Sequence, residues 1–267
     1  MTIQLFEGDC LKVLPTLAKD SVDLVVTSPP YNVGMDYGKG QNDRLEQEDY
    51  LQFLREVMVE LHRVLKVGGR ICWNSPNQIR MKGNGALWSP SITFGGMLEG
   101  AGFKMFELLI WKQGYSDSGT AWGSWCSPSS PFIRHETEAI LVYFKDVWKI
   151  QHRGESDLTP TEFTKWTASE VWEIQPERNR DHPAAFPEKL ASRAIKMFSY
   201  VGDVVLDPFL GSGTTAVACA KLDRRCIGIE MMPEYIKKAE ARILPWKEQT
   251  RLMPLVNNTK RTESESI

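Results

Sequence analysis

The sequence has no long hydrophobic run and few of the residues that hold small secreted or metal-dependent proteins together. No apolar stretch approaches the roughly 18 residues that a bilayer-spanning helix needs. The five cysteines are scattered, odd in number and without a CxxC pair, which argues against a disulfide framework and a zinc site. The four histidines form no cluster with metal-ligand spacing. We therefore expect a protein of the reducing cytoplasm, with no metal and no membrane contact.

The sequence also lacks a strong excess of charge of either sign. Lys and Arg number 32 against 34 Asp and Glu, a net charge of −2. This excludes the uniform basic field that is typical of non-specific nucleic-acid binders. Contact with a nucleic acid would have to come from local patches. The candidates are Arg80 with Lys82, Arg178 with Arg180, and Arg224 with Arg225, each of which taken alone is more typical of a solvated surface.

Short apolar stretches alternate with helical patterns along the chain. Residues 22–27 are apolar except for Asp23, which is typical of a buried parallel strand. Residues 49–65 carry apolar side chains at helical spacing and are followed by Gly68 and Gly69, which predict the end of that helix. Further strands are predicted at 3–6, 70–73, 103–111, 137–144, 203–206 and 226–229, and further helices at 11–17, 92–101, 216–222 and 233–243. The alternation predicts an α/β fold with a mainly parallel sheet in one domain.

The stretch DVVLDPFLGSGTT, residues 203–215, passes from a predicted strand through a glycine turn into a helix. In such folds ligands bind at the carboxyl ends of strands. Gly211 and Gly213 let the backbone approach a bound molecule, and Glu230 ends the next strand, where an acidic side chain typically holds ribose hydroxyls. Ser212, Thr214 and Thr215 offer hydroxyls near helix N-terminal amides. A tight turn that binds nothing is the alternative interpretation.

The sequence of this turn limits the kinds of ligand that it can bind. No Lys follows the glycines, so the stretch is no phosphate loop, and it departs from GxGxxG. A small adenosine-containing ligand therefore fits it better than a dinucleotide does.

The stretch VDLVVTSPPYN, residues 22–32, places two prolines directly after a buried strand. Proline fixes φ and lacks an N–H donor, so the Ser28 hydroxyl and the peptide carbonyls remain as acceptors. Tyr31 adds an aromatic face. Together they form a rigid cup that can stack a flat ring and accept hydrogen bonds from its amino group. A strand-ending turn without a ligand is again the alternative.

Methylation of an exocyclic base nitrogen requires a cup of this kind. The lone pair of such an amine is delocalised into the ring, and accepting its protons in hydrogen bonds frees that lone pair. The methyl group can then pass in line from a sulfonium donor through positioning and electrostatics. A base inside a duplex cannot reach such a cup, so it must be flipped out.

Together, SPPY and DPFLGSGTT resemble the amino-group DNA methyltransferases that depend on S-adenosylmethionine. The catalytic motif precedes the cofactor motif, as in the permuted order called the beta class. The resemblance covers most of the chain. It implies a single Rossmann-like methyltransferase domain with a mainly parallel seven-stranded sheet and inserted target-recognition loops.

The resemblance also implies site residues. Ser28, Pro29, Pro30 and Tyr31 would be catalytic. HPAAFPEKL, residues 182–190, resembles a cofactor-pocket segment that lines the methionine end of the cofactor, and Asp9 matches the position that bonds the adenine amino group. The implied cofactor-binding set is Asp9, Cys10, His182, Phe186, Pro187, Asp207, Pro208, Phe209, Gly211, Ser212, Gly213, Thr214 and Glu230.

Ser28 bears on the target base. In this family Ser at that position is commonly associated with N4 of cytosine, and Asp with N6 of adenine. The physical link is loose, because both side chains accept the same kind of hydrogen bond. The resemblance favours cytosine N4, with adenine N6 or a base in RNA as alternatives within the class. A non-catalytic nucleic-acid-binding subunit that kept the fold is the alternative from another class, and intact SPPY and GSG count against it.

The expected organisation is a methyltransferase domain over 1–256 and a disordered tail over 257–267. Its catalytic half is 1–145 and its cofactor half 182–245. DNA-recognition segments are expected outside the sheet at about 74–90, 113–132 and 146–181. Within them, the residues expected to contact phosphates are Arg80, Lys82, Arg178 and Arg180. Trp122 and Trp125 are expected to stack on bases, and the alternative is that they pack their own loop onto the domain. The expected partners are double-stranded DNA, a second copy of the chain in a homodimer and a cognate restriction endonuclease.

Overall fold

The computed structural model describes residues 2–34, 36–38, 41–42, 45–80, 86–114, 124, 126–131, 133, 135–177 and 186–252. Only the backbone is described at 36–38, 41–42 and 247–252. None of the described helices combines the length and the apolar character that crossing a membrane requires.

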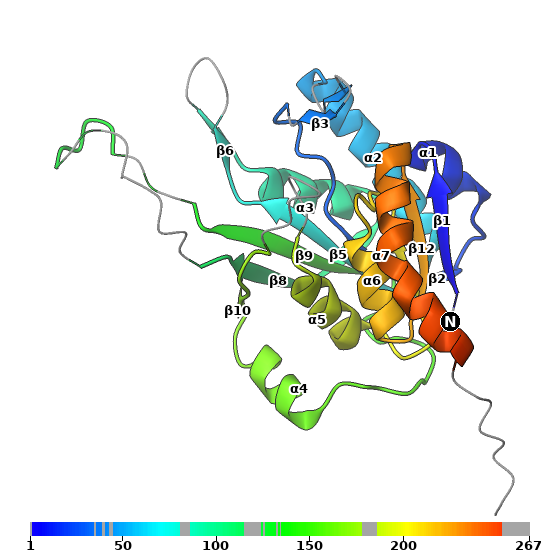
Figure 1. Cartoon of the computed structure of the whole chain (residues 1–267). Coiled ribbons are helices and arrows are strands. Elements are labelled where there is room, and N and C mark those ends of the chain that lie inside the picture. The colour runs from blue at the N-terminus through cyan, green and yellow to red at the C-terminus, as the bar shows by residue number, and fades with distance from the viewer. Residues whose placement is uncertain are drawn as a thin grey trace, which may run out of the picture.

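An eight-stranded sheet forms the centre of this part of the chain, in the order β1-β12-β11-β2-β5-β9-β8-β10 (Figure 1). All neighbouring pairs are parallel except those that β9 makes with β5 and β8. The strands are β1 (Ile3–Glu7), β2 (Val22–Thr27), β5 (Leu65–Pro76), β8 (Phe103–Lys112), β9 (Thr137–Lys145), β10 (Val171–Glu173), β11 (Val204–Asp207) and β12 (Arg225–Glu230). Two small hairpins stand apart, β3 (Asp36–Gly38) with β4 (Gln41–Asn42), and β6 (Ile79–Arg80) with β7 (Leu87–Trp88).

The predicted α/β fold with a mainly parallel sheet is confirmed, but the predicted number of seven strands is wrong. The eighth strand is β10, which pairs with β8. The expectation that all of 146–181 lies outside the sheet is therefore wrong as well. Trp172, at the centre of β10, is 1% exposed, and its burial against the sheet holds the strand in place. Three residues carry no periodic pattern, which is why the sequence did not indicate them.

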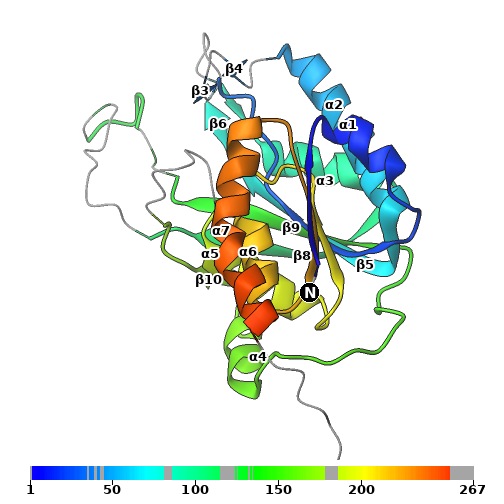
Figure 2. The same ribbon diagram turned by 45° about the vertical axis from the view of Figure 1, so that its right-hand side comes forward.

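Helices cover both faces of the sheet, as Figure 2 shows. In β2, Leu24 and Val26 pack with one core cluster and Val25 with the other, because successive strand residues point to opposite faces. Complete burial of one such side chain contributes about 1.5–3 kcal/mol. One face carries α5 (Glu188–Phe198), α6 (Thr214–Lys221) and α7 (Pro233–Leu252), and the other carries α1 (Cys10–Val13), α2 (Gln47–Val64) and α3 (Pro90–Gly100). A short 3-10 helix, η1 (Leu14–Thr16), follows α1, and the α-helix α4 (Pro160–Thr167) has no buried residue.

The junction between α2 and β5 differs from the prediction. The helix ends at Val64 and the strand begins at once, so Gly68 and Gly69 lie inside β5. Gly68 has φ +80°, and a Cβ there would lie 2.2 Å from the Lys149 carbonyl oxygen. The glycine is required because the chain after β9 passes directly over the strand.

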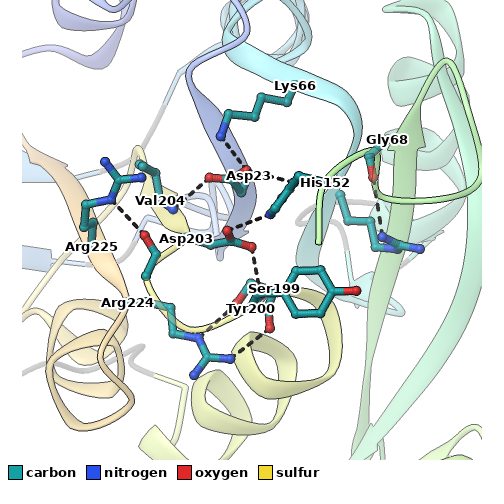
Figure 3. Close-up of polar contacts among 12 residues, drawn as sticks. Asp23, Lys66, Gly68, His152, Ser199, Tyr200, Asp203, Val204, Arg224 and Arg225 are labelled. Atoms are coloured by element: carbon teal, nitrogen blue, oxygen red, sulfur yellow. Dashed lines mark hydrogen bonds and ion pairs between the residues drawn. The ribbon is translucent and has the colours of Figure 1, made fainter. Parts of the chain in front are cut away.

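A polar network fastens residues 146–159 to the amino ends of β2 and β11 (Figure 3). His152 Nε2 lies 2.9 Å from Asp203 Oδ1. Asp23 accepts from Lys66 Nζ at 2.6 Å and from the Val204 amide at 2.9 Å. Because this network occupies the amino edge of the sheet, it is remote from the carboxyl ends where the sequence motifs lie.

Arg224 anchors the same segment from the other side. It is fully buried and donates to Asp157 Oδ1 at 2.8 Å and to the Ser199 carbonyl at 2.8 Å. The interpretation of Arg224 with Arg225 as a surface patch is therefore wrong for Arg224, because internal acceptors hold its guanidinium.

Candidate active site

The two sequence motifs lie side by side at the carboxyl edge of the sheet. Their strands β2 and β11 are parallel neighbours, with Leu24 opposite Val205. Thr27, the last residue of β2, donates from Oγ1 to Asp207 Oδ1 at 2.7 Å across 180 positions of sequence. The Ser28–Tyr31 segment and the glycine turn therefore start from one shared contact.

Asp207 accepts this hydrogen bond and two others. It is 1% exposed and also accepts from Thr215 Oγ1 at 2.7 Å and from the Phe209 amide at 3.1 Å. Burial raises the pKa of its carboxyl from 3.8 to about 6, and the hydrogen bonds from Thr215, Thr27 and Phe209 oppose the rise. These contacts are all internal, so the geometry gives Asp207 the role of holding β2, β11 and α6 together.

The glycine turn begins a helix and is braced by neighbouring elements. Gly211 donates its amide to Glu230 Oε2 at 2.8 Å. Gly213 precedes α6 with φ +87°, and a Cβ there would lie 2.6 Å from the Ala239 Cβ. The absence of a side chain at Gly213 thus serves the packing of α7 as well as any ligand.

Arg242 on α7 is a residue of the turn that the sequence did not indicate. Its Nη1 donates to the Ser212 carbonyl at 2.8 Å and lies 3.1 Å from Ser212 Oγ and 3.3 Å from Thr214 Oγ1. The expected hydroxyl donors are therefore partly engaged by this guanidinium. Arg242 lies one helical turn after Ala239, which packs against Gly213. This relation is visible only when α7 has been placed against the turn, so no local pattern indicated Arg242.

Two acidic residues, Glu230 and Asp9, lie at the ends of β12 and β1. Glu230 accepts from the Gly211 and Met232 amides, each at 2.8 Å, and burial raises the pKa of its carboxyl. Asp9 caps α1 through its Oδ1, which accepts from the Leu11 amide at 3.0 Å. Glu7 pairs with Glu230 in the sheet, and the Gly8 amide donates to the Glu230 carbonyl at 2.9 Å. The carboxylates of Asp9 and Glu230 therefore lie at one corner of the carboxyl edge. They can accept hydrogen bonds from hydroxyl and amino groups of a ligand.

Other members of the expected cofactor set are structural neighbours of this corner. Burial, and then Asp9, raise the pKa of the Cys10 thiol to about 12, so it stays neutral. Phe186 is partly buried and packs on the core cluster of α5 and α6. Phe209 packs in the opposite cluster, 6.0 Å from the Phe53 ring and 6.3 Å from the Trp73 ring. Pro187 is the N-cap residue of α5, and Pro208 is buried between Asp207 and Phe209.

Among the predicted acceptors of the cup, the structure gives contacts for the Ser28 hydroxyl and the Pro30 carbonyl. Ser28 Oγ lies 2.8 Å from Tyr31 Oη. The Pro30 carbonyl accepts from Tyr50 Oη at 2.7 Å, so it serves the fold. Burial, and then the charge of Glu138, raise the pKa of Tyr31 well above its ordinary value, so the phenol stays protonated.

Three further polar residues complete the cup, and the sequence reasoning missed them. Asn74 Nδ2 donates to Tyr31 Oη at 3.0 Å and to Glu138 Oε2 at 2.6 Å. Tyr31 Oη donates to Glu138 Oε2 at 3.1 Å, and Gln113 Nε2 donates to Glu138 Oε1 at 2.7 Å. A weak signal was present, because Asn74 and Glu138 are polar residues within apolar strands.

Among the expected DNA-contacting residues, Arg80 is exposed in β6. Lys82, Trp122, Trp125, Arg178 and Arg180 lie outside the described residues, and so do His182 of the cofactor set and the 257–267 tail.

Comparisons with known proteins agree with this geometry. The family model N6_N4_Mtase, described as DNA methylase, matches residues 22–241. The chain is 35% identical to the type II methyltransferase M.MjaVI of Methanocaldococcus jannaschii, over 67% of this chain and 89% of the relative. It is 31% identical to M.HpaI of Haemophilus parainfluenzae, over 91% and 74% respectively. The solved structure of TTHA0409 from Thermus thermophilus, a DNA modification methylase complexed with S-adenosyl-L-methionine, matches with TM-score 0.72 and 29% identity, over 92% of this chain and 96% of that one.

Proposed function

Because the chain belongs to the N6/N4 DNA methylase family, we propose that it transfers a methyl group from S-adenosylmethionine to the exocyclic N4 of a cytosine flipped out of double-stranded DNA. The observation that carries the proposal is the Thr27–Asp207 hydrogen bond of 2.7 Å, which joins the Ser28 cup to the glycine turn. A methyl donor at the turn and an amino group at Ser28 then face each other across neighbouring strand ends.

The corner of β1, β11 and β12 fits S-adenosylmethionine. Glu230 suits the ribose hydroxyls, because a carboxylate at the end of this strand accepts from them. Asp9 suits the adenine amino group, and Gly211 allows close approach of the backbone. When bound, S-adenosylmethionine supplies a methyl group on a positively charged sulfur.

Ser28 and Tyr31 would prepare the amino group for transfer. The Ser28 hydroxyl accepts a hydrogen bond from the amine, which draws the nitrogen lone pair out of the ring. The Tyr31 ring stacks on the flipped base and fixes its position. Their contribution is positioning and electrostatics, the two effects on which a direct transfer depends.

The base itself is the finer part of the proposal. Ser28 favours cytosine N4 by its resemblance to one subgroup, and adenine N6 is the second candidate because the same acceptors suit its amino group. We assign DNA recognition to those parts of 74–90, 113–132 and 146–181 that lie outside the sheet and outside the amino-edge segment 146–159, with a catalytic half at 1–145 and a cofactor half at 182–245. A homodimer and a cognate restriction endonuclease belong to the same proposal.

The experiment is incubation of the purified protein with unmethylated genomic DNA and methyl-labelled S-adenosylmethionine, followed by nucleoside digestion and mass spectrometry. Labelled N4-methylcytosine is the expected product. Labelled N6-methyladenine would show that the target is the second candidate, adenine N6, and would leave the proposed mechanism in place. If no nucleoside is labelled although the cofactor binds, the proposed activity on DNA is wrong.

A further inference from the structure

The hydrogen bonds around Ser28 continue beyond the cup and end at a carboxylate. Ser28 Oγ lies 2.8 Å from Tyr31 Oη, and Tyr31 Oη donates to Glu138 Oε2 at 3.1 Å. Glu138 belongs to β9, 107 positions away from Tyr31 along the chain. Stacking the base and accepting its amino protons do not require this carboxylate, so these two tasks do not account for its position.

The carboxylate fixes the direction of the hydrogen bonds that lead to it. An ionised carboxylate only accepts hydrogen bonds, so the single hydroxyl proton of Tyr31 is used on Glu138. Ser28 is therefore the donor in its bond with Tyr31. With its own proton committed in this way, Ser28 Oγ keeps lone pairs for an incoming N–H donor.

We propose that Glu138 is the terminal proton acceptor of the methyl transfer, with Ser28 and Tyr31 as the relay that joins it to the target amino group. The inference rests on the proposed function, because it assigns the proton that a methylated amino nitrogen must lose. A nitrogen that gained a methyl group and kept both hydrogens would be a cation in a desolvated pocket, which is costly.

The step balances in atoms and electrons. The lone pair of the amino nitrogen forms the new N–C bond, and the electrons of the broken methyl–sulfur bond remain on sulfur, which becomes neutral. One N–H proton passes to Ser28 Oγ, the Ser28 hydroxyl proton passes to Tyr31 Oη, and the Tyr31 hydroxyl proton passes to Glu138 Oε2. Ser28 and Tyr31 end as neutral hydroxyls, and Glu138 ends as a carboxylic acid.

The surroundings of Glu138 suit a proton acceptor. Burial raises the pKa of its carboxyl, although its hydrogen bonds oppose the rise, and a higher pKa makes it a stronger base than an exposed glutamate. Asn74 Nδ2 and Gln113 Nε2 donate to its two oxygens at 2.6 and 2.7 Å, which fixes the carboxylate against Tyr31.

The charged groups near Glu138 are few in the described part of the chain. Tyr31 is the titratable side chain that contacts it, and its other contacts, Asn74 of β5 and Gln113 after β8, are neutral amides. On the neighbouring β8, Lys112 pairs with Glu173 at 2.6 Å. Asp207 also has a raised pKa, but its contacts are Thr27, Thr215 and Phe209 and not members of the relay. Loss of the acid limb in a Glu138 variant therefore assigns that limb to Glu138.

The test is the pH dependence of transfer in single turnovers, with DNA and S-adenosylmethionine both saturating. For the wild type we expect the rate to fall on the acid side as Glu138 becomes protonated. Glu138→Gln is expected to lower the rate on the order of 100-fold and to remove that acid limb. Tyr31→Phe interrupts the relay and should remove the same limb. The matched control is Glu107→Gln, the same change at an exposed position of β8, which leaves rate and profile unchanged.

A double variant gives the sharper result. Glu138→Gln with Tyr31→Phe should be no slower than the slower single variant, because both changes interrupt one path. A Glu138→Gln variant that keeps the acid limb or the wild-type rate overturns the relay, as does a double variant whose losses multiply. A wild-type protein that methylates no nucleoside overturns the proposed function instead.

The wild-type enzyme supplies a second test if Glu138→Gln does not fold. Several protons move together in the relay, so the single-turnover rate in mixtures of H₂O and D₂O should depend on deuterium content along a curve. A flat or strictly linear dependence overturns the concerted relay. Binding of S-adenosylmethionine, measured by calorimetry for each folded variant, shows whether a loss belongs to the transfer step.

Discussion

The side chains of this site form two separate sets of contacts, one in the cup and one in the cofactor corner. Ser28 contacts Tyr31 in the cup, whereas Glu230 bonds the glycine turn through the Gly211 amide. In the described part of the chain, the hydrogen bond between Thr27 and Asp207 joins the two groups. A change within the cup should therefore act on transfer and leave cofactor binding in place.

Ser28→Ala tests this division. We expect turnover to fall by roughly 100-fold, because one acceptor for the target amine is lost, while the affinity for S-adenosylmethionine stays within about twofold. Ser21→Ala, directly before the same strand, is the matched control. Loss of cofactor binding in Ser28→Ala, measured by calorimetry, would show that the cup and the corner are one site.

Asp207 predicts a pH effect on stability. Its folded pKa is raised from 3.8 to about 6, so the folded state favours the protonated form. Below pH 4 this carboxyl is protonated in the folded and the unfolded state, so the stability it allows is fully present. As pH rises through 6, ionisation of the buried carboxyl lowers the free energy of unfolding by at most about 3 kcal/mol. Urea unfolding of the wild type and Asp207→Asn between pH 4 and 7 measures it. The difference between the two proteins should shift in favour of the variant as pH rises, and a constant difference contradicts the assignment.

At the scale of secondary structure, glycines decide where elements can approach one another. Gly68 lies in β5 under the Lys149 carbonyl, whereas a Cβ at Gly96, inside α3, would meet nothing within 4 Å. The same substitution should therefore have opposite effects at the two positions.

Gly68→Ala is expected to lower the free energy of unfolding by about 3 kcal/mol, because it adds a clash and places a side chain at positive φ. Gly96→Ala should raise the free energy of unfolding by about 0.5–1 kcal/mol, since alanine has the better helix propensity. Chemical denaturation of both variants checks the pair. Equal effects would mean that the close passage of 146–150 over β5 is wrong.

Across the whole molecule, the two edges of the sheet carry different functions. The carboxyl edge holds the cup and the cofactor corner, whereas the amino edge holds the network that fastens 146–159, next to a cavity of about 400 Å³. Because the sheet separates them, we expect damage at the amino edge to lower stability more than catalysis.

Asp157→Ala tests the amino edge, because it leaves Arg224 buried without its carboxylate. The free energy of unfolding should fall by about 3 kcal/mol, with faster proteolysis within 151–159. His152→Ala removes a half-exposed partner and should cost about 1 kcal/mol. Turnover of the folded fraction of Asp157→Ala should match that of the wild type, and a large loss of turnover would mean that the two edges are coupled.

The sequence by itself determined the class of fold and the two motifs of the site. Alternating apolar and helical patterns are local properties, so strands such as 22–27 and the glycine turn after 207 were predictable from neighbouring residues. Because parallel strands end at one edge, the sequence also placed Ser28 and Gly211 at the same side of the sheet.

Only the tertiary structure decided which distant residues meet there. Glu138 reaches Tyr31 across 107 positions, and Asp207 reaches Thr27 across 180. Such contacts depend on strand order and register, and a shift of one residue would turn each side chain to the other face. The strand order is set by burial of both faces of the whole sheet, which no local pattern encodes. For that reason the acceptors of the cup were readable from the sequence, and the carboxylate at the end of their hydrogen bonds was not.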